Sequence, residues 1–121
     1  MKKVLIVDDN PTNLKLASYI ISSLGYVVIE ATDGIEGVEK AFEEDPALIL
    51  MDIDMVKLSG TEAMKRIKEN SSFHDTPIIA FTALAMKGDR EKLIKEGFSD
   101  YLSKPIMLDE FKLTLKKHLD G

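Results

Sequence analysis

The chain contains no cysteine, and this absence removes several kinds of chemistry at once. With no cysteine among 121 residues, a disulfide framework, thiolate catalysis and a cysteine zinc site are all excluded. Histidine is scarce as well: His74 lies in a polar stretch typical of a loop, and His118 lies near the C-terminus. Neither has a partner at metal-ligand spacing. We expect both histidines on the surface and outside any functional site.

Basic residues are too few for a broad nucleic-acid-binding face. The chain has 16 Lys and Arg against 21 Asp and Glu, a net charge of −5, and this negative balance opposes contact with a phosphate backbone. The basic residues Lys112, Lys116 and Lys117 are interpreted as a solvated helix end whose charge suits the helix dipole. No nucleic-acid partner is expected.

Long hydrophobic runs are also missing. Lys2 and Lys3 followed by the apolar residues 4–7 begin like a signal peptide, but Asp8 and Asp9 interrupt the run too early. No apolar run reaches the length that spans a bilayer. We therefore expect a cytoplasmic protein with no membrane partner.

Strand-like and helix-like segments alternate regularly along the chain. Five short apolar runs are each followed by a segment with apolar residues at helical spacing. This alternation predicts one doubly wound α/β domain over residues 1–121, with a five-stranded parallel sheet and helices on both faces. The expected strands are 3–7, 26–30, 47–51, 77–81 and 100–103; the expected helices are 11–24, one from Asp33 to before Pro46, one from Ser59, 90–96, and a last helix marked by Leu108, Phe111, Leu115 and Leu119.

Capping residues mark where the helices begin and end. Asn10 with Pro11 opens the first helix, and Gly25 ends it. Three further helix starts are predicted by capping residues: the pairs Asp33 with Glu36 and Ser59 with Glu62, and the single cap Asp89. The helix that Asp33 opens is expected to bury one face, formed by Ile35, Val38, Ala41 and Phe42.

Four of the expected strands end in a reactive polar residue. Asp8 and Asp9 follow the first strand, Asp52 the third, Thr82 the fourth, and Lys104 the fifth. Ligands of an open parallel sheet bind outside the carboxyl ends of its strands. We therefore expect these side chains to converge on one site.

The three aspartates of this set predict a metal ion. Like charges about 4 Å apart repel by roughly 4 kcal/mol at an effective dielectric near 20, so Asp8, Asp9 and Asp52 need a cation, or one of them must stay protonated. With hard oxygen ligands and neither cysteine nor histidine nearby, Mg²⁺ is the natural choice.

Lys104 and Thr82 point to phosphoryl chemistry beside that metal. A lysine ammonium suits a phosphoryl oxygen as a compact point charge, and a threonine hydroxyl can donate one further hydrogen bond. An aspartate can accept the group as a nucleophile, with most of the catalysis supplied by positioning and charge neutralisation. The residues therefore predict an aspartyl phosphate.

These motifs together resemble the receiver domain of two-component response regulators. The likeness covers the whole chain, and four motifs in order at strand ends are far more specific than any one alone. They are Val7-Asp8-Asp9-Asn10, Leu50-Met51-Asp52-Ile53, Phe81-Thr82-Ala83 and Tyr101-Leu102-Ser103-Lys104-Pro105.

The resemblance implies a role for each site residue. Asp52 would be phosphorylated by a sensor histidine kinase or a histidine phosphotransfer protein. Asp9 and Asp52 would bind Mg²⁺ directly with the backbone carbonyl of Asp54, and Asp8 would act mainly through water. Lys104 would pair with the phosphoryl group. The protein would not be an enzyme in the ordinary sense, since it would catalyse only its own phosphoryl transfer and slow dephosphorylation.

The resemblance also implies how the signal leaves the site. Thr82 would turn toward the phosphoryl group and Tyr101 would change its burial, within a flavodoxin-like strand order 2-1-3-4-5 and beside a cis Lys104-Pro105 bond. A downstream protein would bind the face of the fourth helix, fifth strand and fifth helix, and the protein would be a monomer or a phosphorylation-dependent homodimer. The expected output face includes Ala85, Met86, Lys87, Leu93, Ile106 and Met107, although local packing explains the apolar members almost equally well.

Departures from the family pattern predict differences in behaviour. Many receivers carry proline where this chain has Val56, so we expect a more mobile loop there. Leu84 would shield the phosphoryl group from water, which predicts slow self-dephosphorylation, while the small Ala83 would leave room for the donor.

Two other functions compete with this interpretation. Residues 52–56 match the DxDx[TV] pattern of haloacid-dehalogenase-type phosphatases, but that pattern normally opens the first strand of a longer chain, and here the later acidic motif and a cap domain are missing. The other rival is a receiver-like domain that binds its partner without phosphorylation. The initiating methionine favours a free-standing regulator over a piece of a hybrid kinase, but only moderately.

Overall fold

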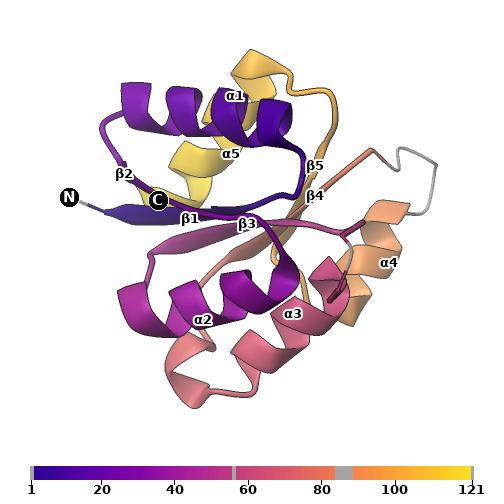
Figure 1. Ribbon diagram of the computed structural model, residues 1–121. Coiled ribbons are helices and arrows are strands. Elements are labelled where there is room, and N and C mark those ends of the chain that lie inside the picture. Colours follow the sequence, from indigo (N-terminus) through magenta and orange to yellow (C-terminus); the bar gives the residue numbers. More distant parts are fainter. Residues whose placement is uncertain (1, 56, 84–88, 121) are drawn as a thin grey trace.

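Five parallel strands form a single sheet in the order β2-β1-β3-β4-β5 (Figure 1). The computed structural model describes residues 2–55, 57–83 and 89–120. The predicted doubly wound α/β fold and its strand order are confirmed. The strands are β1 (Lys3–Val7), β2 (Val27–Ala31), β3 (Leu48–Asp52), β4 (Ile78–Thr82) and β5 (Asp100–Ser103); the helices are α1 (Pro11–Ser23), α2 (Gly34–Glu44), α3 (Gly60–Lys68), the 3₁₀ turn η1 (Ser71–Phe73), α4 (Asp89–Glu96) and α5 (Leu108–Leu119).

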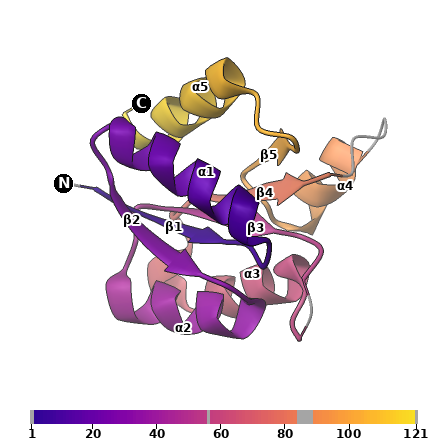
Figure 2. The same ribbon diagram turned by 45° about the horizontal axis from the view of Figure 1, so that its top comes forward.

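The helices form a layer on each face of the sheet. In both views α1 and α5 lie over one face, while α2, α3 and α4 lie over the other (Figures 1 and 2). Residues of β3 and β4 are buried along their whole length, whereas β2 is exposed or partly buried up to its last residue and β5 alternates between buried and partly buried positions. The prediction of central strands that are apolar on both faces is therefore confirmed.

The strand register brings the reactive strand ends to one edge of the sheet. Val7 pairs with Met51 across β1 and β3. Asp52 and Thr82 still pair with residues of neighbouring strands, so each is the last residue of its strand and not the first residue after it, one position later than expected. The backbone that carries each side chain is consequently held in the sheet.

The predicted capping signals are present at the helix starts. The Asn10 side chain accepts hydrogen bonds from the Thr12 and Asn13 amides at 3.0 and 3.1 Å. Gly25 follows α1 with a φ of +92°, a conformation that favours glycine. Ser59 and Asp33 cap α3 and α2 as expected, while α4 begins at Asp89 itself, one residue earlier than predicted.

The expected inward stripe of α2 is wrong in two places. Ile35 and Phe42 are 45% and 46% exposed. The helix approaches the sheet through Gly37 and the expected Ala41, while Gly34 is buried against Leu58. Small residues let the backbone come close, and this displaces the larger apolar side chains to the flank of the helix. In α5, Leu108 is likewise exposed.

Phe111 of α5 provides a test of this packing. Its ring lies edge-on to Phe81 with centroids 6.3 Å apart and is 1% exposed. We expect Phe111→Ala to lower the free energy of unfolding by about 3–5 kcal/mol. Leu113→Ala, in the same helix but at a side chain that is 71% exposed, should change it by less than about 0.5 kcal/mol. Urea unfolding of both variants measures this, and equal losses would contradict the assigned orientation of α5.

Candidate functional site

Three carboxylates meet at the carboxyl ends of the central strands. Asp8 and Asp9 follow β1, and Asp52 ends β3, which pairs with β1. One carboxylate oxygen from each of the three lies within 4.8 Å of the others. Asp8 and Asp52 are buried while Asp9 is exposed, so the cluster is open to solvent on one side only. At such separations like charges repel strongly unless a cation intervenes.

Lys104 is the cation that the protein itself supplies to this cluster. Its Nζ lies 2.9 Å from Asp8 Oδ2 and 3.2 Å from Asp52 Oδ1. The Lys104 amide donates a hydrogen bond to the Thr82 carbonyl at 2.8 Å, and the ammonium lies 4.9 Å from the centre of the Phe81 ring. The backbone hydrogen bond to β4 therefore holds the main chain of Lys104 in place, so that its side chain reaches Asp8 and Asp52.

The pKa values show that one lysine does not fully neutralise two buried carboxylates. Burial, followed by the nearby Asp8 charge, raises the pKa of Asp52 from 3.8 to about 6, although Lys104 acts in the opposite direction. Burial alone would lower the pKa of Lys104, but its contacts with Asp8 and Asp52 outweigh burial and raise it. The site thus holds a stable ammonium beside a carboxylate that ionises reluctantly.

One buried carboxylate oxygen of Asp8 has no well-directed hydrogen bond among the described residues. Its Oδ1 accepts a hydrogen bond from the Asn10 amide at 2.9 Å. Its Oδ2 is buried, and within the described part of the chain its only close cation, Lys104, approaches at an angle outside hydrogen-bond geometry. Buried polar atoms almost always have a partner. A hard cation such as Mg²⁺ matches this oxygen-only donor set, so the residues present fit that metal.

Asp54 lies beside the cluster without joining it through its side chain. Its amide donates a hydrogen bond to Asp52 Oδ1 at 3.3 Å, while its carboxylate is exposed and outside the group of three. The role expected for Asp54 involved its backbone carbonyl, and this remains a prediction.

The two expected switch residues occupy neighbouring strands. Thr82 is fully buried at the end of β4, and Tyr101 is partly buried on β5. Burial raises the pKa of the Tyr101 hydroxyl, with smaller contributions from the negative charges of Asp89 and Glu110. Their motion on phosphorylation remains a prediction.

The expected output face is only partly exposed. Met107 is 59% exposed, but Leu93 is 5% exposed and belongs to the core, so its assignment to the surface is wrong. The described surface also includes two exposed apolar side chains that the sequence did not indicate, Ile94 and Leu108. Ile106 is partly buried against the core. Ala85, Met86 and Lys87 lie outside the described residues, as do Val56 and Leu84.

His118 is less exposed than expected of a surface residue, with 18% of its side chain accessible. Its Nε2 lies 2.9 Å from Oδ2 of the buried Asp100 at the start of β5. Arg90 and Lys117 approach the same carboxylate at 3.5 and 3.7 Å. Burial would raise the pKa of Asp100, but the hydrogen bonds with His118 and the Tyr101 amide, together with the Lys117 charge, lower it. This cluster joins α4, β5 and α5 at the opposite end of β5 from Lys104. The sequence feature that could have indicated it is an aspartate at the first position of an apolar strand.

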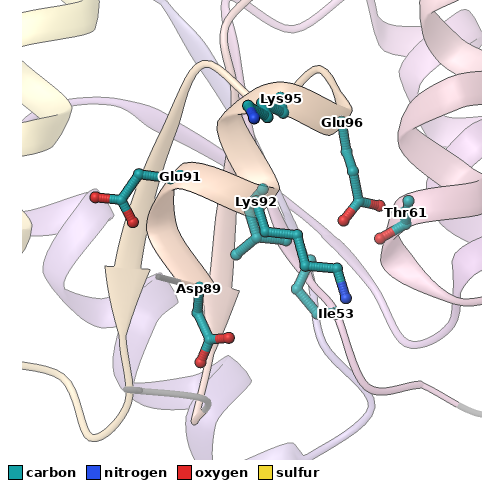
Figure 3. Close-up of a pocket in the computed structure, with 8 residues that line it drawn as sticks. Ile53, Thr61, Asp89, Glu91, Lys92, Lys95 and Glu96 are labelled. Carbon is teal, nitrogen blue, oxygen red and sulfur yellow. The ribbon is translucent and has the colours of Figure 1, made fainter. Parts of the chain in front are cut away.

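A separate cleft of about 650 Å³ lies between α3 and α4. Figure 3 shows Lys92 and Glu96 extending from α4 toward Ile53 and Thr61. Its polar lining comes mainly from exposed side chains of the single helix α4. The cleft is therefore a groove left by the packing of α4, adjacent to the acidic cluster through Ile53 but without its chemistry.

Comparison with known proteins identifies the family. Residues 4–116 match the model of the response regulator receiver domain. The chain is 42% identical over 118 residues to the polar-differentiation response regulator DivK of Brucella ovis, a match that covers 98% of this chain and 96% of that protein. The chain therefore belongs to the response regulator receiver domain family, whose members are phosphoacceptor switches of two-component signalling.

Solved structures agree with this assignment. The receiver domain of the sensor histidine kinase PA1611 from Pseudomonas aeruginosa is 36% identical with a TM-score of 0.90, covers 99% of this chain and 98% of its own, and holds a magnesium ion in its active-site cleft. The chemotaxis protein CheY4 of Vibrio cholerae is 29% identical with a TM-score of 0.91, covering 98% of this chain and 99% of its own. Receiver domains bind Mg²⁺ at their acidic site and interact with histidine kinases or phosphotransfer proteins and with downstream targets. Of the helices that the structure describes, none has the length and apolar character needed to cross a membrane.

The raised pKa of Asp52 predicts how pH and metal affect stability. In the folded protein the pKa of Asp52 is about 6, above the ordinary value of 3.8. The free energy of unfolding of the metal-free protein should therefore fall as the pH rises between these two values. Asp52→Asn removes this loss and should raise the metal-free free energy of unfolding at about pH 7.5 by about 1–3 kcal/mol.

Urea unfolding with a chelator, and again with excess Mg²⁺, measures the effect. Mg²⁺ should stabilise the wild-type protein more than Asp52→Asn, and the exposed control Asp54→Asn should behave like the wild type without metal. The explanation fails if Asp52→Asn is no more stable than the wild type in chelator.

Proposed function

We propose that Asp52 accepts a phosphoryl group from the phosphohistidine of a sensor histidine kinase or a phosphotransfer protein, in a reaction that requires Mg²⁺. The observation that carries this proposal is the contact of one lysine with two buried carboxylates beside an unfilled Asp8 oxygen. The site is short of positive charge and open on one side, which favours entry of a metal ion together with an anionic phosphoryl group.

The chain's own atoms define how the transfer proceeds. Asp52 Oδ1 is held by the Lys104 ammonium and the Asp54 amide, which leaves Oδ2 as the nucleophile. As Oδ2 forms a bond to phosphorus, the bond from phosphorus to the donor imidazole breaks and its electron pair stays on that nitrogen. Mg²⁺ bound at the acidic cluster would offset the charge of the carboxylates and of the phosphoryl oxygens. Positioning and electrostatics thus supply the catalysis.

Phosphorylation would change the partners of Lys104. The ammonium now pairs with Asp8 and Asp52, and a phosphoryl oxygen on Asp52 would offer it a stronger, more negative acceptor. The buried Thr82 hydroxyl lies at the neighbouring strand end and would donate to the same group. The movement of Thr82, followed by Tyr101, would bias a two-state element toward its active form.

The output of this switch is another protein. We propose that a downstream target binds the face of α4, β5 and α5, with the exposed Met107 and the partly exposed Ile106 among its contacts; Met86 belongs to this proposal as well. Flexible methionine side chains adapt to more than one partner. The protein would work in the cytoplasm, where kinases find ATP, as a monomer or a phosphorylation-dependent homodimer without nucleic acid or membrane partners.

Intact-mass measurement with acetyl phosphate tests the proposal. The wild-type protein should gain one phosphoryl group in the presence of Mg²⁺ and none in chelator. Asp52→Asn should gain none, whereas Asp54→Asn, two residues away and exposed, should still be modified. Continuous turnover without an adduct would favour the phosphatase alternative, and no reaction with this donor or with a kinase would favour binding without phosphorylation.

A slow loss of the phosphoryl group is a second prediction, based on sequence alone. Leu84 stands two residues past Thr82, and an apolar side chain there would exclude the attacking water. We expect Leu84→Glu to shorten the lifetime of the aspartyl phosphate by about tenfold, less than the roughly 100-fold or more that a fully positioned acid or base contributes. Mass spectra taken at intervals after donor removal measure both lifetimes, with Leu84→Met as the control. Equal lifetimes for the Glu and Met variants would show that Leu84 does not shield the site.

A further inference from the structure

The connection from β3 to α3 is tightly approached by the start of a different helix, α2. At Gly34, the first residue of α2, an added Cβ would overlap the Leu58 carbonyl oxygen and would lie 2.9 Å from Leu58 Cβ. Both contacts involve rigid parts of the connection, so a side chain at position 34 cannot be accommodated unless the connection moves. Leu58 itself is 9% exposed and packs in the core beneath α2 and α3.

A charged contact lies beside this close approach. Asp33 Oδ2 is 3.5 Å from the Lys57 Nζ, while Asp33 Oδ1 accepts the Glu36 amide at 2.8 Å as the cap of α2. Lys57 has a φ of +68°, a backbone conformation that non-glycine residues rarely adopt. Asp33, the cap of α2, and Gly34, its first residue, therefore contact Lys57 and Leu58 in succession.

The α3 end of the connection is hydrogen-bonded to and packed against the backbone at the proposed phosphorylation site. The Gly60 amide donates a hydrogen bond to the Ile53 carbonyl at 3.1 Å, and an added Cβ at Gly60 would overlap the Asp52 carbonyl oxygen. The Asp54 amide also donates to Asp52 Oδ1. A shift at Leu58 would therefore be transmitted through Gly60, two residues further along, to the backbone of Asp52 and Ile53.

We propose that Gly34 and Asp33 of α2 are positioning residues for the metal site. They hold Leu58 and Lys57, and thereby keep the backbone beside Asp52 where it can complete the coordination of the cation. The inference rests on the proposed Mg²⁺-dependent function. Ligands must be held within about 0.5 Å of the productive geometry by surrounding packing, and loss of such support weakens metal binding by about 10- to 100-fold.

Gly34→Ala tests the packing half of the proposal, and Gly37→Ala is its matched control. At Gly37, one turn further along α2, an added Cβ would lie 2.9 and 3.0 Å from the two methyl groups of Val7, so this change strains the packing of α2 without contact with Leu58. Both variants should lower the free energy of unfolding. By isothermal titration calorimetry, Gly34→Ala should weaken Mg²⁺ binding about tenfold or more, and Gly37→Ala less than about threefold.

Lys57→Gln tests the contribution of the ion pair between Asp33 and Lys57, in a variant that should fold normally. If charge alone mattered, removing a cation near the acidic cluster would strengthen Mg²⁺ binding. Under the positioning proposal the loss of the Asp33 contact should instead weaken it, by about two- to fivefold, the range of an exposed ion pair. Tighter Mg²⁺ binding by Lys57→Gln would contradict this half even if Gly34→Ala could not be purified.

The outcomes also separate this inference from the proposed function. A wild-type protein that binds no Mg²⁺ would overturn both. A wild type that binds Mg²⁺ and is phosphorylated, together with a folded Gly34→Ala that binds Mg²⁺ equally well, would overturn the positioning role alone. Equal weakening by Gly34→Ala and Gly37→Ala would do the same, because it would assign the effect to the general packing of α2.

Discussion

The repulsion between Asp8 and Asp52 is the constraint on which the rest of the site depends. Both carboxylates are buried, and among the described residues they share a single ammonium, that of Lys104. This leaves an Asp8 oxygen without a well-directed hydrogen bond and raises the pKa of Asp52 to about 6. Under the proposed function, a divalent cation would stabilise this site and a phosphoryl group would enter together with it. The shortage of positive charge would then be the property on which that function depends.

The sheet creates this constraint through parallel pairing. Because β1, β3 and β4 are adjacent and run in the same direction, their ends deliver Asp8, Asp52 and Thr82 to one edge. The bond from the Lys104 amide to the Thr82 carbonyl brings the lysine to the same place from β5. Helices α1 and α5 on one face and α2, α3 and α4 on the other exclude water from the strands beneath. Burial of these charges therefore follows from the architecture itself.

The sequence predicted the features that depend on local pattern and strand order. The five strands, the caps at Asn10, Asp33 and Ser59, and the gathering of reactive residues at strand ends all follow from apolar periodicity and known turn chemistry. It failed where tertiary packing decides: Phe42 is exposed because glycines bring α2 close to the sheet, and Leu93 is buried because α4 turns it inward. The pairing of His118 with Asp100 joins residues 18 positions apart on different elements, which no local pattern records.

Titration of the Asp52 carboxyl carbon by NMR, without and with Mg²⁺, shows directly whether the site is short of positive charge. The metal-free protein should show a pKa near 6, because burial and Asp8 disfavour the charged form. Saturating Mg²⁺ should move the transition well below this value, since an adjacent cation favours the carboxylate. A carboxyl that titrates near its ordinary value of 3.8 without metal, or one that Mg²⁺ leaves unchanged, would contradict the account of a cation-deficient site.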